Sequence, residues 1–296
     1  MKSYLHKFSK GGVRYPNVSI HINLGDICML DKNSLTFSSS PAAAAPSAHA
    51  QSAIVVPIRR SSITVLCSSC NLRKICMPQG ITVDEFNQVD VTFSAKREVK
   101  AGRLLFRNGE KFTSLFAIRT GAFKSYVALE DGNEQVTGFQ MSGELLGLDG
   151  IASNHHTCNA MALEDSEVCL MPFRQLEELA HNIPVLQRHF HKIMSSDIFN
   201  QKQISIVLAG MRAEARLAAF FLNLVDRLHA RGLSQSDILL RMTRQEIGSY
   251  LGIKPETVSR VFSKFSKSGL MEVSHRSIRI LRMDMLCDLA DHCACA

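Results

Sequence analysis

The sequence predicts an α+β protein built from an antiparallel β-rich body, one long helix and a C-terminal winged helix-turn-helix. Three patterns support this: short apolar runs separated by turn residues as far as Met171, a helical apolar stripe from Ile183, and two short capped helices after Thr243. The 296 residues are 46% apolar and 21% charged, a composition that suits a globular protein with a sizeable core.

The lengths of the apolar runs also indicate the cellular compartment of the protein. No run reaches the roughly 18 residues needed to span a bilayer, and residues 1–7 lack the apolar core of a secretory signal. We therefore expect a cytoplasmic protein with no membrane partner. Nine cysteines in that reducing compartment favour metal or redox chemistry over disulfides.

The composition changes along the chain and predicts its domain boundaries. Residues 36–53 are rich in Ser, Ala and Pro, which is typical of a tail or linker. We expect a disordered tail at 1–60, a cysteine-bearing loop at 61–80, a β-rich sensor body at 81–182, a long helix at 183–212 and the winged helix-turn-helix domain at 213–290.

The β-rich body is predicted from about Val89 to Met171. Apolar runs such as 115–118 and 123–127 alternate with glycine-containing turns, which is typical of an antiparallel sandwich or barrel. The segment Asp131-Gly132-Asn133 has the composition of a hairpin tip.

The segment from Ile183 to about Met211 is predicted to be one helix with Pro184 in its first turn. Its apolar stripe comprises Leu186, Phe190, Ile193, Ile204, Leu208 and Met211, and it is interrupted by Asp197, Asn200 and Gln201. The stripe fits either an intramolecular core face or a dimer seam. A seam with this polar middle would be weak, because facing Asp197 carboxylates would repel each other.

The C-terminal module is basic, whereas the middle of the chain is nearly neutral. Residues 241–282 carry nine basic and three acidic side chains. A compact basic module favours a polyanionic partner, nucleic acid first.

Two helices are predicted within this module. Thr243 and Glu246 form a capping box that starts the first helix, and Gly252 ends it. Pro255 opens the second helix and Gly269 ends it, and two short helices joined in this way form a helix-turn-helix. Residues 271–280 are predicted to form a β-hairpin wing.

The second helix has two distinct faces. The apolar residues Val258, Val261, Phe262 and Phe265 share one face and are expected to be buried. The other face carries Glu256, Ser259, Arg260 and Ser263, where a recognition helix presents side chains to base edges. Arginine suits guanine and glutamate suits the cytosine amino group. Lys264 and Lys267 are expected to reach phosphates.

Three cysteines, Cys67, Cys70 and Cys76, follow the spacing C-x2-C-x5-C. Thiolates on one loop can close around a metal centre, and both an iron–sulfur cluster and tetrahedral zinc would need a fourth ligand. The candidates for that ligand are Cys28, Cys158, Cys169, Cys287, Cys293 and Cys295. Spacing alone leaves zinc and iron–sulfur open.

An enzymatic function is not expected. His155 and His156 are adjacent on a predicted loop, so their side chains point in different directions. No Ser/His/Asp set or paired carboxylates accompany them in a catalytic pattern.

From Cys67 to Leu289 the sequence resembles the bacterial FNR regulators, the oxygen-sensing branch of the cyclic-AMP receptor protein (CRP/FNR) superfamily. The matching stretches are Cys67-x2-Cys70-x5-Cys76, residues 115–121, residues 132–139, His155-His156, Val168-Cys-Leu-Met-Pro-Phe173 and Glu256-Thr-Val-Ser-Arg260.

The resemblance implies a cyclic-nucleotide-binding-like β-roll, a dimerisation helix and a winged helix-turn-helix. It implies a [4Fe–4S] cluster on Cys67, Cys70, Cys76 and Cys169, with Cys169 in the family's Val-Cys-x-x-Pro-Phe context. It also places DNA contacts on Glu256, Ser259 and Arg260. The expected protein is a homodimer that binds palindromic DNA with TTGAT-type half-sites, contacts RNA polymerase and controls genes of anaerobic metabolism. Oxygen would convert or destroy the cluster and separate the dimer.

Two alternatives remain: a CRP-like regulator that responds to another effector, and a zinc-bound DNA-binding protein or scaffold. Cyclic AMP is not the expected effector. Its receptors hold the cyclic phosphate with an Arg-Ser pair after a Gly-Glu-Leu turn, and residues 154–158 after Gly143-Glu-Leu145 contain no arginine.

Overall fold

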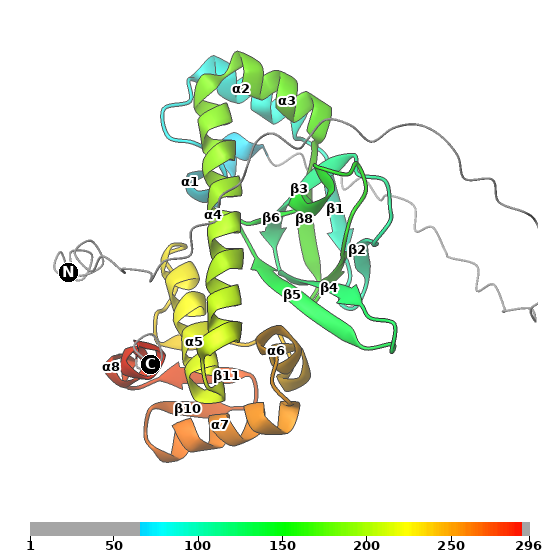
Figure 1. Ribbon diagram of the computed structural model, residues 1–296. Helices are drawn as coiled ribbons and strands as arrows, with labels where there is room; N and C mark the ends of the chain where they lie inside the picture. The colour runs from blue at the N-terminus through cyan, green and yellow to red at the C-terminus, as the bar shows by residue number, and fades with distance from the viewer. Residues whose placement is uncertain (1–65, 292–296) are drawn as a thin grey trace, which may run out of the picture. The chain divides into compact units, whose positions relative to one another are not determined.

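The structure is a computed structural model that describes residues 66–291, all of which belong to one unit starting at Val56. The expected tail at 1–60 lies outside the described residues, as do Cys28, Cys293 and Cys295. Along the described chain a short helical segment, a β-rich body, a long helix and a mixed C-terminal domain follow one another (Figure 1).

The β-rich body consists of two four-stranded antiparallel sheets, with strand orders β1-β8-β3-β6 and β2-β7-β4-β5. The strands are β1 (Lys96–Val99), β2 (Leu104–Phe106), β3 (Ser114–Thr120), β4 (Ala122–Ala128), β5 (Glu134–Met141), β6 (Leu145–Leu146), β7 (Asn159–Ala162) and β8 (Ser166–Pro172). Both sheets contribute to one apolar core that includes Phe106, Ile118, Phe123 and Val168. The predicted hairpin tip is confirmed, because Asn133 N–H donates to Asp131 Oδ1 over 2.9 Å between β4 and β5.

The prediction that β structure starts near Val89 was wrong. Val89 is buried in α2 (Val83–Thr92), and the first strand begins at Lys96. Thr82 and Glu85 form a capping box there, which starts a helix ahead of the apolar residues. The short helical elements before it are a 3-10 turn at Cys67–Ser69 and α1 (Arg73–Cys76), and α3 (Phe173–Asn182) follows the sheets.

The predicted long helix is α4 (Pro184–Gly210), with Pro184 at its first turn. Leu186 is buried, but Ile198 is 56% exposed, Phe199 58% and Ile206 56%. In the second half of α4, Ile198, Phe199 and Ile206 are therefore left exposed within one chain, whereas Ile204 packs against the core of the C-terminal domain. These exposed residues lie outside the predicted stripe, whose own members are buried or half-buried, with Phe190 and Ile204 packed on core clusters. The stripe is therefore at least partly an intramolecular core face.

The C-terminal domain contains α5 (Ala213–His229), β9 (Asp237–Leu239), α6 (Arg244–Leu251), α7 (Pro255–Lys267), β10 (Met271–Ser274), β11 (Ser277–Ile280) and α8 (Met283–Asp291). The predicted capping box is confirmed, since Thr243 Oγ1 accepts a hydrogen bond from Glu246 N–H over 3.2 Å. Gly252 ends α6 with φ +61°, as the sequence predicted.

The predicted wing is the hairpin β10–β11, and β9 adds a third strand that the sequence pattern did not predict. Between residues 66 and 291, no helix combines the length and the apolar character that crossing a bilayer would require.

Candidate metal centre and nucleic-acid interface

Four cysteines line one small cavity between the short N-terminal helices and the β-rich body. Cys67, Cys70 and Cys76 come from the segment 67–76, which we call the cysteine loop, and Cys169 comes from β8. The cavity has a volume of about 30 Å³. Its other lining residues are Leu72, Arg73, Met77, Phe93, Ala117, Ile118, Arg119 and Met171.

Cys169 occupies the most rigid position of the four. Strand β8 lies between β1 and β3, and Cys169 is paired with Lys96 on one side and Ala117 on the other. A residue hydrogen-bonded within a sheet on both sides is a fixed anchor for a ligand set.

The cysteine loop is attached by a few specific contacts. Ser68 N–H donates to the buried Asp90 Oδ1 over 3.1 Å, and the Arg73 guanidinium lies 4.2 Å from the centroid of the Phe86 ring. His189 Nε2, on α4, lies 3.1 Å from the carbonyl oxygen of Cys76. The loop is therefore in contact with both α2 and the long helix.

The cavity favours neutral thiols. Burial first, and then the neighbouring Cys169, raise the pKa of Cys67 to about 12. Burial and the neighbouring Cys70 raise the pKa of Cys76 to about 12 as well. The pKa of Cys169 is raised by burial. Any metal bound by these sulfurs would have to displace their protons.

The four thiols are near enough to influence one another's charge. In the described part of the chain, no three His, Cys, Asp or Glu side chains are grouped so that they could hold a single metal ion. A lone Zn²⁺ would need its sulfurs within about 2.3 Å of one point.

Cys158 lies outside this cavity. It is in a loop before β7, and its thiol donates to Asp149 Oδ2 over 3.6 Å while its side chain packs against the core between the two sheets. Cys287 is in α8, on the C-terminal domain. Of the candidate fourth ligands within 66–291, Cys169 is the one that lines the cavity.

The adjacent histidines have separate surroundings. His156 is buried, its ring stacks on Phe106 with 3.7 Å between centroids, and its Nδ1 lies 3.4 Å from Asp149 Oδ1. His155 is exposed and contacts the carbonyl oxygen of Ser153. The pair therefore does not form one reactive site.

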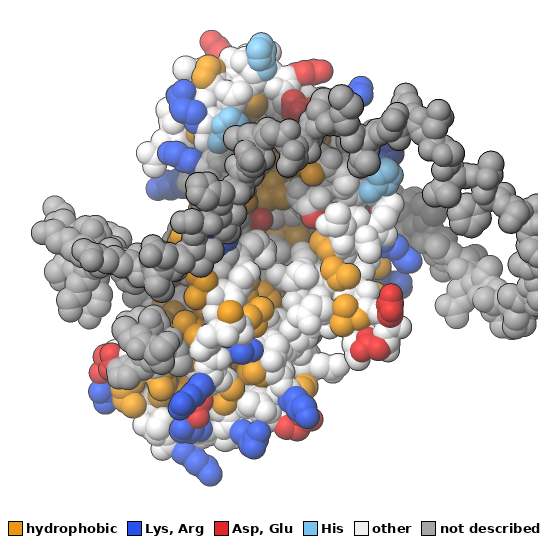
Figure 2. Space-filling view, in the orientation of Figure 1, with side chains coloured by type: hydrophobic (Ala, Val, Ile, Leu, Met, Phe, Trp, Pro, Cys, Tyr) orange, Lys and Arg blue, Asp and Glu red, His pale blue; other side chains and the backbone are white. Residues whose placement is uncertain are grey.

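The recognition helix α7 has the two faces that the sequence indicated. Val258, Val261, Phe262 and Phe265 are at most 6% exposed, whereas Glu256, Ser259, Arg260 and Ser263 are all exposed. Ser259, Arg260, Ser263, Lys264 and Lys267 line a shallow depression. Lys and Arg side chains gather at this end of the molecule (Figure 2).

Local contacts orient several of these exposed side chains. Arg260 Nη2 donates to Thr257 Oγ1 over 3.1 Å. Lys264 Nζ lies 2.7 Å from Glu214 Oε1 on α5, so this lysine has a partner within the chain that a DNA phosphate would have to replace.

One positioning residue escaped the sequence analysis. Arg216 on α5 donates to the carbonyl oxygens of Leu208 (2.9 Å), Met211 (2.8 Å) and Leu251 (2.9 Å). It thereby satisfies the ends of both α4 and α6 and fixes the long helix against the helix-turn-helix. In the sequence, Arg216 is marked only by being the one charged residue in the apolar run 215–221.

Two family models match the two domains. The model described as "Crp-like helix-turn-helix domain" matches residues 215–289, and "Cyclic nucleotide-binding domain" matches residues 96–182. The two matches and the fold define a DNA-binding transcription regulator with an N-terminal domain of the cyclic-nucleotide-binding type, and they confirm the predicted α+β class.

Similar proteins identify the family. The chain is 39% identical over 239 residues to the Fumarate and nitrate reduction regulatory protein of Escherichia coli, covering 81% of this chain and 96% of that protein. It is 40% identical over 224 residues to the Transcriptional activator protein anr of Pseudomonas aeruginosa, covering 76% and 92%. The structure of FixK2 from Bradyrhizobium japonicum matches with a TM-score of 0.61 and 26% identity, covering 66% of this chain and 96% of that one. The chain therefore belongs to the CRP/FNR family of transcription regulators, which are not enzymes.

Cys158 is expected to be a slow nucleophile. Burial and the adjacent Asp149 raise its pKa to about 12, so at pH 8 only about one thiol in ten thousand is ionised. Iodoacetamide should label Cys158 on the order of a thousandfold more slowly than an ordinary thiol, and the rate should rise about tenfold per pH unit between pH 8 and 10. Mass spectrometry of the native protein measures the rate.

The Asp149→Asn variant is the control for this effect. It removes the negative charge beside the thiol and should speed the labelling of Cys158. Labelling of the wild-type residue as fast as free glutathione would contradict the assigned environment.

Proposed function

We propose that this regulator responds to oxygen through a [4Fe–4S] cluster held by Cys67, Cys70, Cys76 and Cys169. The observation that carries the proposal is that these four thiols, from two distant parts of the sequence, line one cavity. Iron–sulfur clusters of this type are held by four cysteine thiolates, which is the donor set present here.

The resemblance to the FNR regulators favours a cluster over a single zinc ion. Each cysteine of a four-iron cluster binds a different iron, and four cysteines also suit tetrahedral zinc, so the donor set fits both. The FNR-like motifs around Cys67–Cys76 and Cys169 favour the cluster. When bound, the cluster would supply an oxygen-sensitive iron centre. The chain would supply a fixed ligand on β8 and three ligands on the cysteine loop.

The exposed apolar residues of α4 support a homodimer. Ile198, Phe199 and Ile206 are each more than half exposed in the single chain, and burial against a second copy would remove them from water. A two-fold dimer would place two α7 helices about one helical turn of DNA apart, on a palindrome with TTGAT-type half-sites.

On DNA, we assign base contacts to Glu256, Ser259 and Arg260, with Ser263, Lys264 and Lys267 beside them. All six side chains are exposed on one face of α7. Such a regulator would act in the cytoplasm, would contact RNA polymerase as the resemblance implies, and would control genes of anaerobic metabolism.

Single serine substitutions test the ligand set. Cys67→Ser, Cys70→Ser, Cys76→Ser and Cys169→Ser should each abolish iron loading in anaerobic reconstitution, together with specific DNA binding, because each removes one of four thiolates. Iron and sulfide analysis, the brown absorbance of the loaded protein and gel-shift titration measure the outcome.

The matched control is Cys158→Ser, which should load iron and bind DNA nearly as wild type does. Loss of the cluster in Cys158→Ser with a full cluster in Cys169→Ser would show that the fourth ligand is assigned wrongly. A colourless anaerobic preparation that contains stoichiometric zinc would instead favour the zinc alternative.

Substitutions on α7 separate base contacts from phosphate contacts. Arg260→Ala should cost about 1–3 kcal/mol on the specific site and relax the preference at the guanine. Lys267→Ala should weaken binding to all sequences about equally and reduce the salt dependence. Titrations on specific and random duplexes at several salt concentrations distinguish the two. An equal loss on both duplexes for Arg260→Ala would mean that α7 docks differently.

Cyclic AMP should not activate this protein, although residues 96–182 match the cyclic-nucleotide-binding model. The loop at 154–158 offers no guanidinium to the cyclic phosphate, and a buried phosphate charge without one is poorly compensated. Titration calorimetry should detect no tight binding. Stoichiometric binding that also raises DNA affinity would favour the alternative of a cyclic-nucleotide receptor.

A further inference from the structure

The turn Ser142–Glu144 lies directly against the cysteine loop. A Cβ atom on Gly143 would come within 3.0 Å of Ile75 Cγ2, and the Gly143 carbonyl oxygen lies 4.0 Å from Cys76 Sγ. Gly143 has φ +89°, a conformation that other residues rarely adopt, so glycine is what allows this close approach.

The same turn is fixed to the central strand of the sheet. Gly143 N–H donates to the carbonyl of Ile118 over 2.8 Å, and Ile118 N–H donates to the carbonyl of Glu144 over 2.9 Å. Ile118 itself lines the thiol cavity. The turn is therefore in contact with two walls of the cavity, one formed by the cysteine loop and one by β3.

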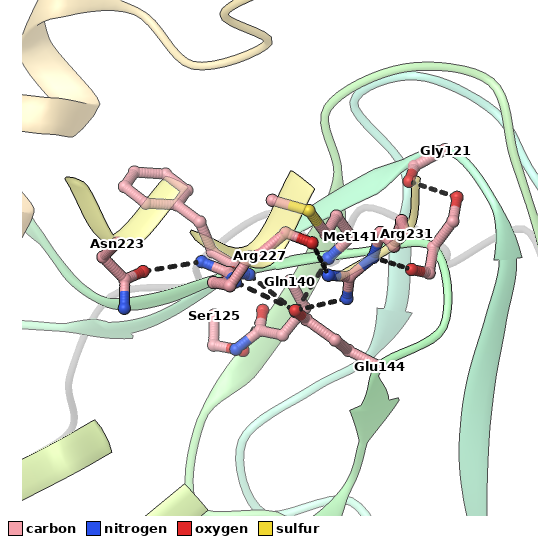
Figure 3. A network of polar contacts seen from close by, with 10 residues as sticks. Gly121, Ser125, Gln140, Met141, Glu144, Asn223, Arg227 and Arg231 are labelled. Carbon is pink, nitrogen blue, oxygen red and sulfur yellow. Dashed lines mark hydrogen bonds and ion pairs between the residues drawn. The ribbon is translucent and has the colours of Figure 1, made fainter. Parts of the chain in front are cut away.

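The Glu144 carboxylate connects this turn to the DNA-binding domain. Arg227 Nη2 donates to Oε2 and Arg231 Nη2 donates to Oε1, each over 2.6 Å, as Figure 3 shows. Arg227 Nε also donates to Oε1 over 2.9 Å. Glu144 and Arg231 are only 24% and 8% exposed, so water screens these charge-assisted bonds less than it would on an open surface.

Both arginines also bind the backbone beside this turn. Arg227 Nη2 donates to the Phe139 carbonyl over 2.6 Å, and Arg231 Nε donates to the Ser142 carbonyl over 2.5 Å. Helix α5, which carries Arg227, packs on the recognition helix through Phe221 and Phe262, whose ring centroids are 5.4 Å apart. Contacts therefore run without a break from the cysteine loop to α7.

We propose that Glu144 is a positioning residue through which occupancy of the thiol cavity alters the placement of the DNA-binding domain within one protomer. The proposal rests on the proposed function, because it takes the cavity as the place where the cluster binds. The space between the thiols is small, about 30 Å³, so a group bound by all four would press on its lining, the cysteine loop included.

The cysteine loop is the wall that can move. Neither the turn Cys67–Ser69 nor α1 has a buried residue, whereas much of the remaining lining lies on the hydrogen-bonded strands β3 and β8. A shift of α1 would press Ile75 on Gly143 and change the Glu144 contacts with Arg227 and Arg231. The same loop reaches the long helix separately, through the contact between the Cys76 carbonyl and His189.

The test compares full-length wild type with Glu144→Gln, both metal-free and after anaerobic reconstitution with ferrous iron and sulfide. The measurements are iron content, the sedimentation coefficient and the Kd for a duplex with TTGAT-type half-sites. We expect wild type to gain DNA affinity on loading. In Glu144→Gln, the increase in DNA affinity on loading should be about tenfold smaller than in wild type, a typical size for coupling between two sites. Its iron content and dimerisation should be unchanged.

The matched control is Glu164→Gln. Glu164 Oε1 also joins the β-rich body to the C-terminal domain, 3.1 Å from Arg241 Nε, but this pair contacts neither the turn nor the cysteine loop. Loss of the Glu164–Arg241 pair should leave the increase in DNA affinity on loading unchanged. Ile75→Ala removes the other end of the connection and should reduce the gain as Glu144→Gln does, with no further reduction in the double variant.

The outcomes are distinguishable. Wild type that takes up no iron, or gains no DNA affinity on loading, would refute the proposed function. If wild type takes up iron and gains DNA affinity, and Glu144→Gln gains as much affinity as wild type, the coupling proposal alone would be overturned. An equal loss in Glu164→Gln, or loss of dimerisation in Glu144→Gln, would also overturn it. Should Glu144→Gln fail to fold by circular dichroism, Ile75→Ala decides the question in the same assays.

Discussion

The position of Cys169 within a three-strand pairing is the constraint on which the candidate site depends. Because β8 is hydrogen-bonded to β1 and β3, Cys169 cannot move without disturbing the sheet, whereas the other three thiols lie on a segment without buried residues. A ligand set with one fixed member and three adjustable ones can take up a group and release it without unfolding the domain, because local opening costs less than global unfolding.

Several contacts hold the DNA-binding domain to the β-rich body, among them an ion pair between Lys124 and Glu246 and the packing of Phe139 on Phe220 and Tyr250. Three further polar contacts lie along the same boundary. Arg227 and Arg231 bind Glu144, Arg241 pairs with Glu164, and Ser249 on α6 caps the edge of β5, where its hydroxyl donates to the Glu134 carbonyl over 2.7 Å and accepts from Val136 N–H over 2.8 Å. The first of these contacts adjoins the cysteine loop. A change in the cavity would therefore strain one attachment while the others, including Lys124–Glu246 and the Phe139 contacts, hold, which favours a shift of the domain over its detachment.

The sequence predicted features that depend on local chemistry. The capping box at Thr243, the left-handed Gly252, the hairpin tip at Asp131 and the long helix after Ile183 all follow from neighbouring residues, and all are present. The sequence prediction failed at Val89, because the apolar spacing there fits a strand as well as a helix. The capping box at Thr82 is the feature that indicates the helix. The sequence pattern gave no sign of the contact of Arg216 with Leu251 or of the arginines that bind Glu144, because these partners are 35 and more than 80 residues away in the chain.

The exposed residues of α4 and the polar contacts of the cysteine loop suggest how a weak dimer could be controlled. Ile198 and Phe199 lie next to Asp197, so any seam formed there would bury apolar area beside a carboxylate that prefers water. Such a seam would be weak. His189 joins α4 to the carbonyl of Cys76, one of the residues that line the cavity, so a change in the cavity would reach the start of the long helix. Dimerisation and domain placement would then depend on the same ten-residue loop through two different contacts, His189 for the first and Glu144 for the second.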